Sequence, residues 1–199
     1  MKSNVCKIEK GTKDLDAILK ESERVAEYNA LTHKQALQLR LLCEEVDGML
    51  PNIIDDFEGE LWFDFEEGVC KVNVSIEIPE LNTDKKKELI GVAKSKKNAA
   101  AVGIVGKIRN AIENFFLNEE MMESLAMSAG STGYGPGYYE RAGYACLWRL
   151  EEYRNSVKKE EHAEAWDELE KSVIASASDD VIVGVKGKRA EIIIVKKFA

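Results

Sequence analysis

The chain of 199 residues contains few of the residues that organise metal, redox or nucleophilic chemistry. It has only two histidines, His33 and His162, and four cysteines. The cysteines lie too far apart in the sequence for the CxxC pairs of zinc or dithiol sites. No HExxH or EF-hand pattern organises the many carboxylates. We therefore expect reduced and mostly buried thiols, with neither a resident metal site nor a histidine-dependent catalytic triad.

Long apolar runs and long basic runs are also absent. No apolar stretch reaches the ~18 residues that a membrane span needs, and the first residues do not read as a signal peptide. The 28 Lys and Arg stand against 36 Asp and Glu, a net charge of −8, with no basic run longer than residues 85–87. Such a chain is a poor ligand for nucleic acid or an anionic membrane. The sequence predicts a cytoplasmic protein with neither of these as its partner.

Prolines are scarce, and none lies in a linker. There are three in the whole chain, whereas 45% of the residues are hydrophobic, which favours one domain over residues 1–199. Five of the 14 glycines fall at 128–143, so this Gly/Tyr-rich segment is interpreted as a loop. We expect it to belong to a helical insertion at residues 117–178.

The remaining elements follow from hydrophobic periodicity. Apolar residues recur at helical spacing over 14–28, from Thr32 to about Leu50, and from 108 toward 122, and a short helical stretch is expected from 82 to 97. Alternating polarity predicts hairpins at 61–78 and 181–195. Residues 144–159 and 161–176 are expected to be helical. Because helices and hairpins are segregated along the chain, we predict an α+β two-layer sandwich, a mostly antiparallel sheet with helices on one face.

Local residue chemistry marks both ends of the second predicted helix. Thr32 and Gln35 have the spacing of a capping box, in which each side chain accepts a free backbone N–H of the first turn. Pro51 lacks the backbone donor that a continuing helix would use. The helix is therefore expected to start at Thr32 and to stop or kink near Leu50.

One glycine-rich stretch invites comparison with a phosphate-binding loop. Residues 130–137 read GSTGYGPG, but the Lys-Ser/Thr pair that follows in a P-loop is missing, and the stretch follows a predicted helix rather than a strand. We interpret it as a flexible loop whose tyrosines cover a ligand or contact a partner.

The most informative constellation is an acidic helix, a hairpin and a small-residue turn that leads into another helix. The first reads LLCEEVDGML at 41–50, and the last reads NAAAVGIVGKIRNAIE at 98–113. This order of parts resembles the histidine-kinase-like ATPases, the superfamily of Hsp90, gyrase B and the anti-sigma-factor serine kinases. The resemblance implies the fold of that family, with ATP and Mg²⁺ as cofactors. It covers residues 10–116 and 179–198.

In the acidic helix, the resemblance places Glu44 on the family's acidic catalytic position, with Glu45 as the alternative register. Family members carry an Asn about one turn later, and this Asn holds the magnesium ion on ATP. Gly48 stands at that position in the first register and Met49 in the second. The resemblance therefore implies a nucleotide site at Gly48 that lacks one ligand to magnesium.

In the small-residue turn, the resemblance places Ala101, Gly103, Gly106 and Lys107 beside the phosphates. Two of the family's glycines are replaced, by Ala99 and Ala101, and a methyl group there stands where the phosphates need close approach of the backbone. The family's adenine-binding Asp-x-Gly motif is also replaced, by PELNT at 79–83.

These changes predict a regulatory protein that resembles the anti-sigma-factor kinases, has a weakened nucleotide site and acts mainly through protein binding. If it is active, it is an ATPase or a serine protein kinase. The alternative is an adaptor that binds no nucleotide and holds its protein partner through the aromatic residues at 134–148 or through an exposed sheet edge. A homodimer is compatible with either hypothesis, and no dimer face is indicated.

Overall fold

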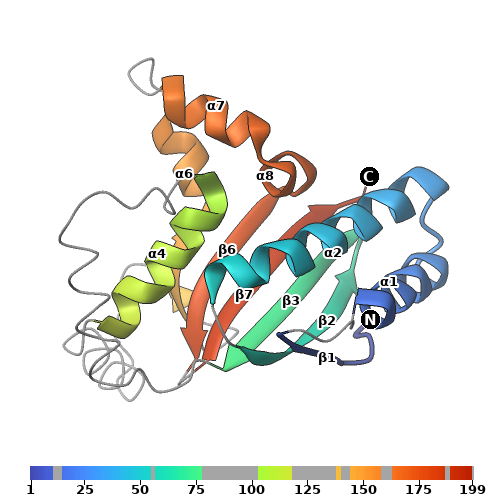
Figure 1. Ribbon diagram of the computed structural model, residues 1–199. Helices are drawn as coiled ribbons and strands as arrows, with labels where there is room; N and C mark the ends of the chain where they lie inside the picture. The colour runs from blue at the N-terminus through green and yellow to red at the C-terminus, as the bar shows by residue number, and fades with distance from the viewer. Residues whose placement is uncertain are drawn as a thin grey trace.

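The computed structural model describes residues 1–10, 15–54, 57–77, 103–117, 138–139, 144–157, 163–186 and 189–198. These residues form an α+β protein in which helices pack against an antiparallel sheet (Figure 1). The sheet has six strands of four to nine residues and a two-residue strand at one edge. The strands are β1 (Cys6–Glu9), β2 (Glu58–Glu66), β3 (Val69–Glu77), β4 (Tyr138–Tyr139), β5 (Tyr144–Arg149), β6 (Asp180–Lys186) and β7 (Arg189–Lys197).

The strand order is β1-β2-β3-β7-β6-β5-β4, and every neighbouring pair is antiparallel. The two predicted hairpins are β2–β3 and β6–β7, and β3 pairs with β7 along its whole length. The β2–β3 turn consists of Glu67 and Gly68, both with positive φ, as a type I′ turn requires. Residues 187–188, which join β6 to β7, lie outside the described residues.

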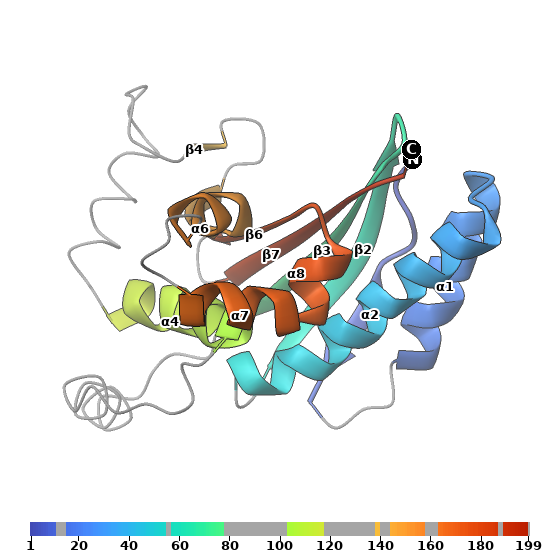
Figure 2. The same ribbon diagram turned by 90° about the horizontal axis from the view of Figure 1, so that it is seen from above.

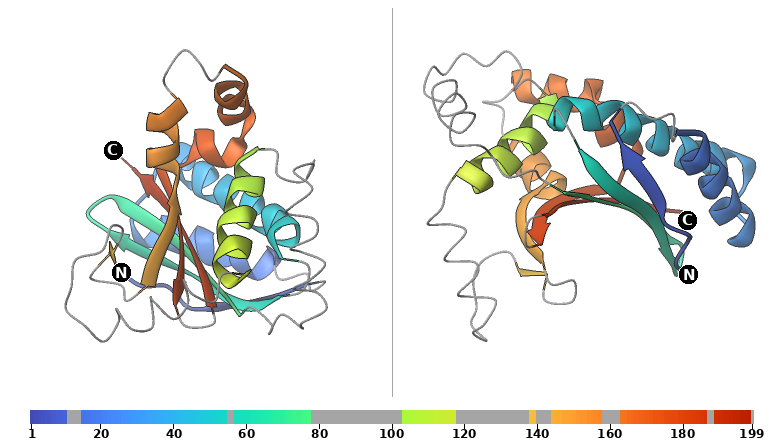
Figure 3. Two further views of the ribbon diagram at one scale, coloured as in Figure 1. Left: turned by 90° about the vertical axis from the view of Figure 1, so that its left-hand side faces the viewer. Right: turned by 60° about the horizontal axis from the view of Figure 1, so that its bottom comes forward.

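Six helices are described: α1 (Leu15–Tyr28), α2 (His33–Ile53), α4 (Gly103–Leu117), α6 (Leu150–Val157), α7 (Ala163–Lys171) and α8 (Val173–Ala177). They gather on one side of the curved sheet (Figure 3). Alternation along the strands then divides the side chains between the two faces. The helix-facing positions are apolar and fully buried, among them Leu61, Val72, Val74, Ile192 and Ile194. The predicted mostly antiparallel sheet with helices on one face is confirmed for the described residues.

The capping box predicted at the start of α2 is present. The Gln35 N–H donates to Thr32 Oγ1 at 3.4 Å, and the Thr32 N–H donates to Gln35 Oε1 at 2.9 Å. The predicted stop near Leu50 is wrong, because α2 continues through Pro51 to Ile53, and the alternative of a kink near Leu50 stays a prediction. Proline removes one backbone donor there and its ring crowds the carbonyl four residues earlier. Ile53 is buried in the core, so packing of the last turn outweighs these costs.

The segment before the last hairpin differs from the predicted helical insertion. Residues 144–149 form strand β5, which pairs with β6, and helix α6 starts only at Leu150. The other predicted helix in this segment is present as α7 and α8, divided at Ser172. Strand β1 was not predicted. The expected helix at 82–97 and most of the Gly/Tyr-rich loop at 128–143 lie outside the described residues.

Candidate functional site

Helix α2 carries the predicted catalytic residues, and its neighbours define its two flanks. Viewed from above, α1 lies along one side of α2, whereas α4 and α8 lie along the other (Figure 2). The side of α2 toward the sheet is a continuous apolar stripe. Its buried members are Leu39, Leu42, Cys43, Val46, Met49, Leu50 and Ile53.

Glu44 lies on the solvent side of α2, with 42% of its side chain exposed. Its carboxylate accepts a hydrogen bond from Arg40 Nε at 3.1 Å, and Arg40 also reaches Glu23 of α1 at 3.0 Å. These contacts direct Glu44 and Arg40 toward the α1 flank. The carboxylate that was predicted to be catalytic is therefore part of a surface ion-pair network between α1 and α2.

Gly48 and Glu45 flank this position on α2. Gly48 is exposed, and a Cβ atom added there would meet no other atom within 4 Å. The position predicted to lack a magnesium ligand thus has open space and no side-chain donor atom. Glu45 is partly buried and lies seven residues, or about two turns, before Asn52. Because the Asn52 carbonyl accepts from Arg109 of α4 at 3.5 Å, Glu45 occupies the flank that faces α4.

The predicted phosphate-binding residues open helix α4 rather than a flexible turn before it. Gly103 is the first residue of α4 and has a φ of +79°, a conformation that favours glycine. Gly106 and Lys107 follow within the helix. Lys107 Nζ lies 5.2 Å from the centroid of the Tyr153 ring, so the cation is stacked on α6. Ala101 lies outside the described residues.

The structure therefore brings the predicted site together only in part. Helices α2 and α4 are in contact, and the contact recorded between their side chains and backbone is near the end of α2, at Asn52. Glu44 lies more than two turns earlier and faces α1. Among the described residues, the acidic position and the start of α4 share no hydrogen bond or ion pair.

Two residues of α2 that were not predicted to be functional are large apolar side chains exposed to solvent. Leu37 is 51% exposed and Leu41 is 39% exposed, and they lie one turn apart. On a helical wheel they project away from the buried stripe, on the same side as Glu44 and Gly48. The signal was present in the sequence, since both leucines fall outside the apolar period that defines the core face.

The aromatic segment proposed for the adaptor alternative is described only near its end. The ring of Trp148 packs at 6.0 Å from that of Tyr153 and against the core. The Tyr153 hydroxyl is buried and, among the described residues, has no hydrogen-bond partner. Burial and the nearby Glu168 raise the pKa of Tyr153. Tyr138 and Tyr139 form β4, and Tyr134 lies outside the described residues.

The cysteines are free thiols, as expected, but two of the four are only partly buried. Cys43 of α2 and Cys70 of β3 lie in the core, and burial raises the pKa of the Cys43 thiol well above its usual range. Burial also raises the pKa of Cys70 to about 12. Since the thiolate is the nucleophilic form, neither residue is suited to catalysis.

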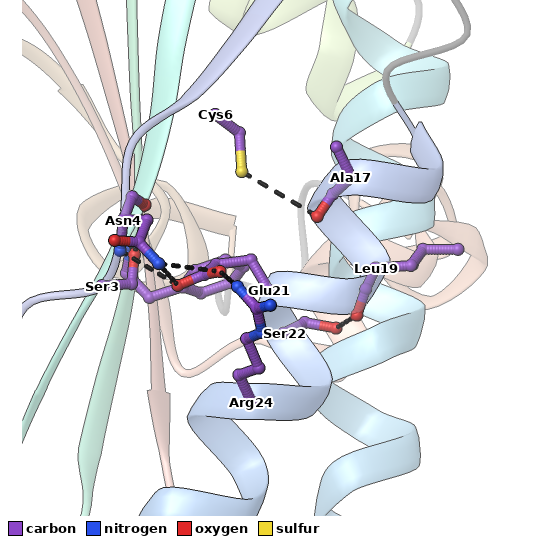
Figure 4. Close-up of polar contacts among 9 residues, drawn as sticks. Ser3, Asn4, Cys6, Ala17, Leu19, Glu21, Ser22 and Arg24 are labelled. Carbon is purple, nitrogen blue, oxygen red and sulfur yellow. Dashed lines mark hydrogen bonds and ion pairs between the residues drawn. The ribbon is translucent and has the colours of Figure 1, made fainter.

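A buried carboxylate is the centre of the polar cluster that joins the N-terminal segment to α1 (Figure 4). Glu21 accepts hydrogen bonds from the backbone N–H of Asn4 at 3.0 Å and from its side chain at 3.1 Å. Arg24 lies 3.3 Å from the same carboxylate. Ser3 Oγ accepts from the Phe63 N–H at 2.8 Å. These donors occupy Glu21, so we assign the cluster a structural role.

Polar side chains also pair across the face of the sheet that lies opposite the described helices. Asn73 donates to Asp64 at 3.0 Å, and the Ser75 hydroxyl donates to Glu191 at 2.6 Å while it accepts from Arg189 Nε at 2.8 Å. Asn73 and Ser75 are both buried. The cross-strand bonds therefore satisfy polar groups that burial would otherwise leave unpaired.

The described residues thus define an α+β protein whose α2 helix presents two leucines and an ion pair to solvent. Comparison with protein-family models, with curated proteins and with solved structures finds no match. Over the described ranges, no three His, Cys, Asp or Glu side chains gather in a way that would hold a metal ion. None of the helices described combines the length and the apolar character of a membrane span.

Proposed function

We propose that this chain is a regulatory binding protein that works mainly by docking a protein partner on the solvent face of α2. The fold order that resembles the histidine-kinase-like ATPases then serves as a scaffold for this face and does not support efficient ATP turnover. The observation that carries the proposal is the pair Leu37 and Leu41. Exposed leucines one turn apart on a helix are a common anchor for partner helices and grooves.

The state of the predicted catalytic residues supports the same proposal. An acidic residue that positions magnesium or an attacking group has to be free to meet the nucleotide. Glu44 is instead held by Arg40, and Gly48 offers no ligand. A glycine and two leucines on the face that would carry nucleotide chemistry suit close approach of another protein surface.

The first test measures the melting temperature with millimolar ATP or ADP plus Mg²⁺. A ligand that binds only the folded state stabilises it by an amount set by its concentration over Kd. We expect no shift with either nucleotide. A shift of several degrees that is lost in Glu44→Ala would contradict the proposal and restore the ATPase interpretation.

The second test compares the proteins captured by the immobilised wild-type chain with those captured by the variant Leu37→Lys/Leu41→Lys. Val5→Lys is the matched control, because Val5 is 49% exposed but lies in the N-terminal segment. A protein held by wild type and Val5→Lys but lost from the double variant supports docking on α2. Equal capture by all three places the partner elsewhere.

Nucleotide binding without turnover is the second candidate. Its observation is the start of α4, where Gly103 lets the backbone approach a phosphate group and Lys107 adds a cation near a helix N-terminus, whereas Gly106 is buried within the helix. Glu45 faces this helix from α2. For this candidate, ATP raises the melting temperature, and Lys107→Ala reduces that rise.

A further inference from the structure

The exposed residues on the solvent face of α2 form a pattern that is complementary to a second copy of itself. Lys34, Leu37, Leu41 and Glu44 follow one another at spacings of three, four and three residues, and all four are exposed. At 3.6 residues per turn these spacings place them in one stripe. A charged residue lies at each end of the stripe and two leucines lie between them. The basic residue is at the N-terminal end and the acidic residue is at the C-terminal end.

Two copies of this stripe fit each other when they run antiparallel. A twofold axis at the level of residue 39 sets Leu37 against the partner's Leu41, and the same contact repeats with the copies exchanged. Lys34 then faces the partner's Glu44, again twice. Such reciprocal pairing is the defining property of an isologous interface. The charge order opposes a parallel arrangement, which would set like charges against each other.

The electrostatics of α2 favour this occupant over an arbitrary acidic or basic protein. The first turn of α2 contains His33 and Lys34 and no acidic residue, although the positive end of a helix dipole favours negative charge there. The charged side chains recorded beside Glu44 are Arg40 and, through it, Glu23 of α1. An antiparallel second copy brings an acidic side chain to the uncompensated first turn of each α2.

We propose that the partner docked on α2 is a second copy of this chain, bound antiparallel through Lys34, Leu37, Leu41 and Glu44. This inference rests on the proposed protein-binding function of the same helix face. One helix from each copy provides less contact than the ~800 Å² per partner of a standard interface. We therefore expect a reversible, concentration-dependent dimer with a Kd between about 1 µM and about 1 mM.

The decisive experiment is a charge-reversal cycle read by sedimentation velocity from about 1 µM to about 1 mM protein. Lys34→Glu and Glu44→Lys each set like charges against each other at both symmetry-related pairs of the dimer. Each should raise Kd at least about tenfold, because two attractive pairs are replaced by two repulsive ones. The double variant Lys34→Glu/Glu44→Lys restores opposite charges and should return Kd to within about threefold of wild type. Within one copy the two residues are about 15 Å apart, beyond the Debye length of ~8 Å, so rescue has to arise between copies.

Controls separate this inference from the proposed function. Leu37→Lys should abolish the dimer, whereas Val5→Lys should sediment like wild type, and circular dichroism checks that each variant is folded.

A wild-type chain that stays monomeric at every concentration overturns the inference. If a different captured protein is still lost from Leu37→Lys/Leu41→Lys, the proposed function stands with another partner. If wild type is monomeric and no captured protein depends on the leucines, both fail. A dimer that the double variant does not restore overturns the antiparallel pairing.

Discussion

Single side chains decide how the N-terminal segment is held against the rest of the molecule. The side chain of Glu21 is only 8% exposed, and it accepts two donors from Asn4 as well as the guanidinium of Arg24. Hydrogen bonds to a charged and buried acceptor contribute more to stability than neutral ones. The segment before β1 is therefore fixed to α1 by one carboxylate.

Replacement of this carboxylate should destabilise the fold. We expect Glu21→Ala to lower the free energy of unfolding by about 2 kcal/mol and the melting temperature by about 4–8 °C, because Asn4 and Arg24 lose their shared acceptor. Asn4→Ala should cost about 1 kcal/mol, with a coupling of at least about 0.5 kcal/mol in the double variant. Urea denaturation measures the free energy of unfolding of both single variants and of the double variant.

Glu23→Ala, on an exposed residue of the same helix, is the control and should stay within about 0.5 kcal/mol of wild type. Equal losses for Glu21→Ala and Glu23→Ala would contradict the role given to Glu21.

The residue scale also shows what the sequence could reveal about the candidate site. The pair Arg40 and Glu44 has the i,i+4 spacing of a helix ion pair, so it could be read from the sequence. The contact of Arg40 with Glu23 could not, because it depends on how α1 packs on α2. Leu37 and Leu41 could be recognised as leucines outside the core stripe, but only the structure shows that no described element covers them.

At the scale of elements, the strongly periodic segments were predicted and the weakly patterned ones were not. Strand β1 is four residues long and buries only Ile8, which is too short for an alternation to be visible. Strand β5 consists of Tyr, Ala, Cys, Leu, Trp and Arg, and its alternation is broken by a register shift between Cys146 and Trp148. Its strand conformation comes from pairing with β6, some 35 positions later in the chain, and such long-range pairing overrides local propensity.

Two glycines in different elements should respond oppositely to the same added methyl group. A Cβ atom at Gly59 of β2 would lie 2.5 Å from the backbone oxygen of Ser75, so the β2–β3 pair has to shift. We expect Gly59→Ala to lower stability by about 1–3 kcal/mol. Gly48→Ala, in open space within α2, should raise it by about 0.5–1 kcal/mol. Urea denaturation of both variants measures the contrast. A loss at Gly48 would indicate that its backbone conformation or close surroundings matter for α2.

At the scale of the whole molecule, the β3–β7 pairing unites the two halves of the chain. Residues 69–77 pair with 189–197, and the helix-facing apolar side chains of both strands are buried in one core cluster with those of α2, α4 and α6. The first residue and the last strand also meet at the β2–β3 turn. The N-terminal ammonium of Met1 donates a hydrogen bond to the Phe65 carbonyl, and the Phe198 N–H donates to the Gly68 carbonyl. The two halves of the chain therefore share one hydrophobic core.

This continuity predicts one cooperative unfolding transition, although the segment 117–178 was interpreted as an insertion. Trp62 on β2 and Trp148 on β5 report on strands toward opposite edges of the sheet. Two variants each keep one of these tryptophans, with the others replaced by Phe. Within each variant, fluorescence and circular dichroism should give the same urea midpoint and the same slope. The physical reason is that β5 pairs with β6, and β6 with β7, so loss of β5 exposes apolar surface shared with the centre of the sheet. An earlier transition at Trp148 alone would instead mean that the segment containing β5 and α6 unfolds as a separate unit. The sheet would then depend for its stability on the pairing of β2, β3, β7 and β6.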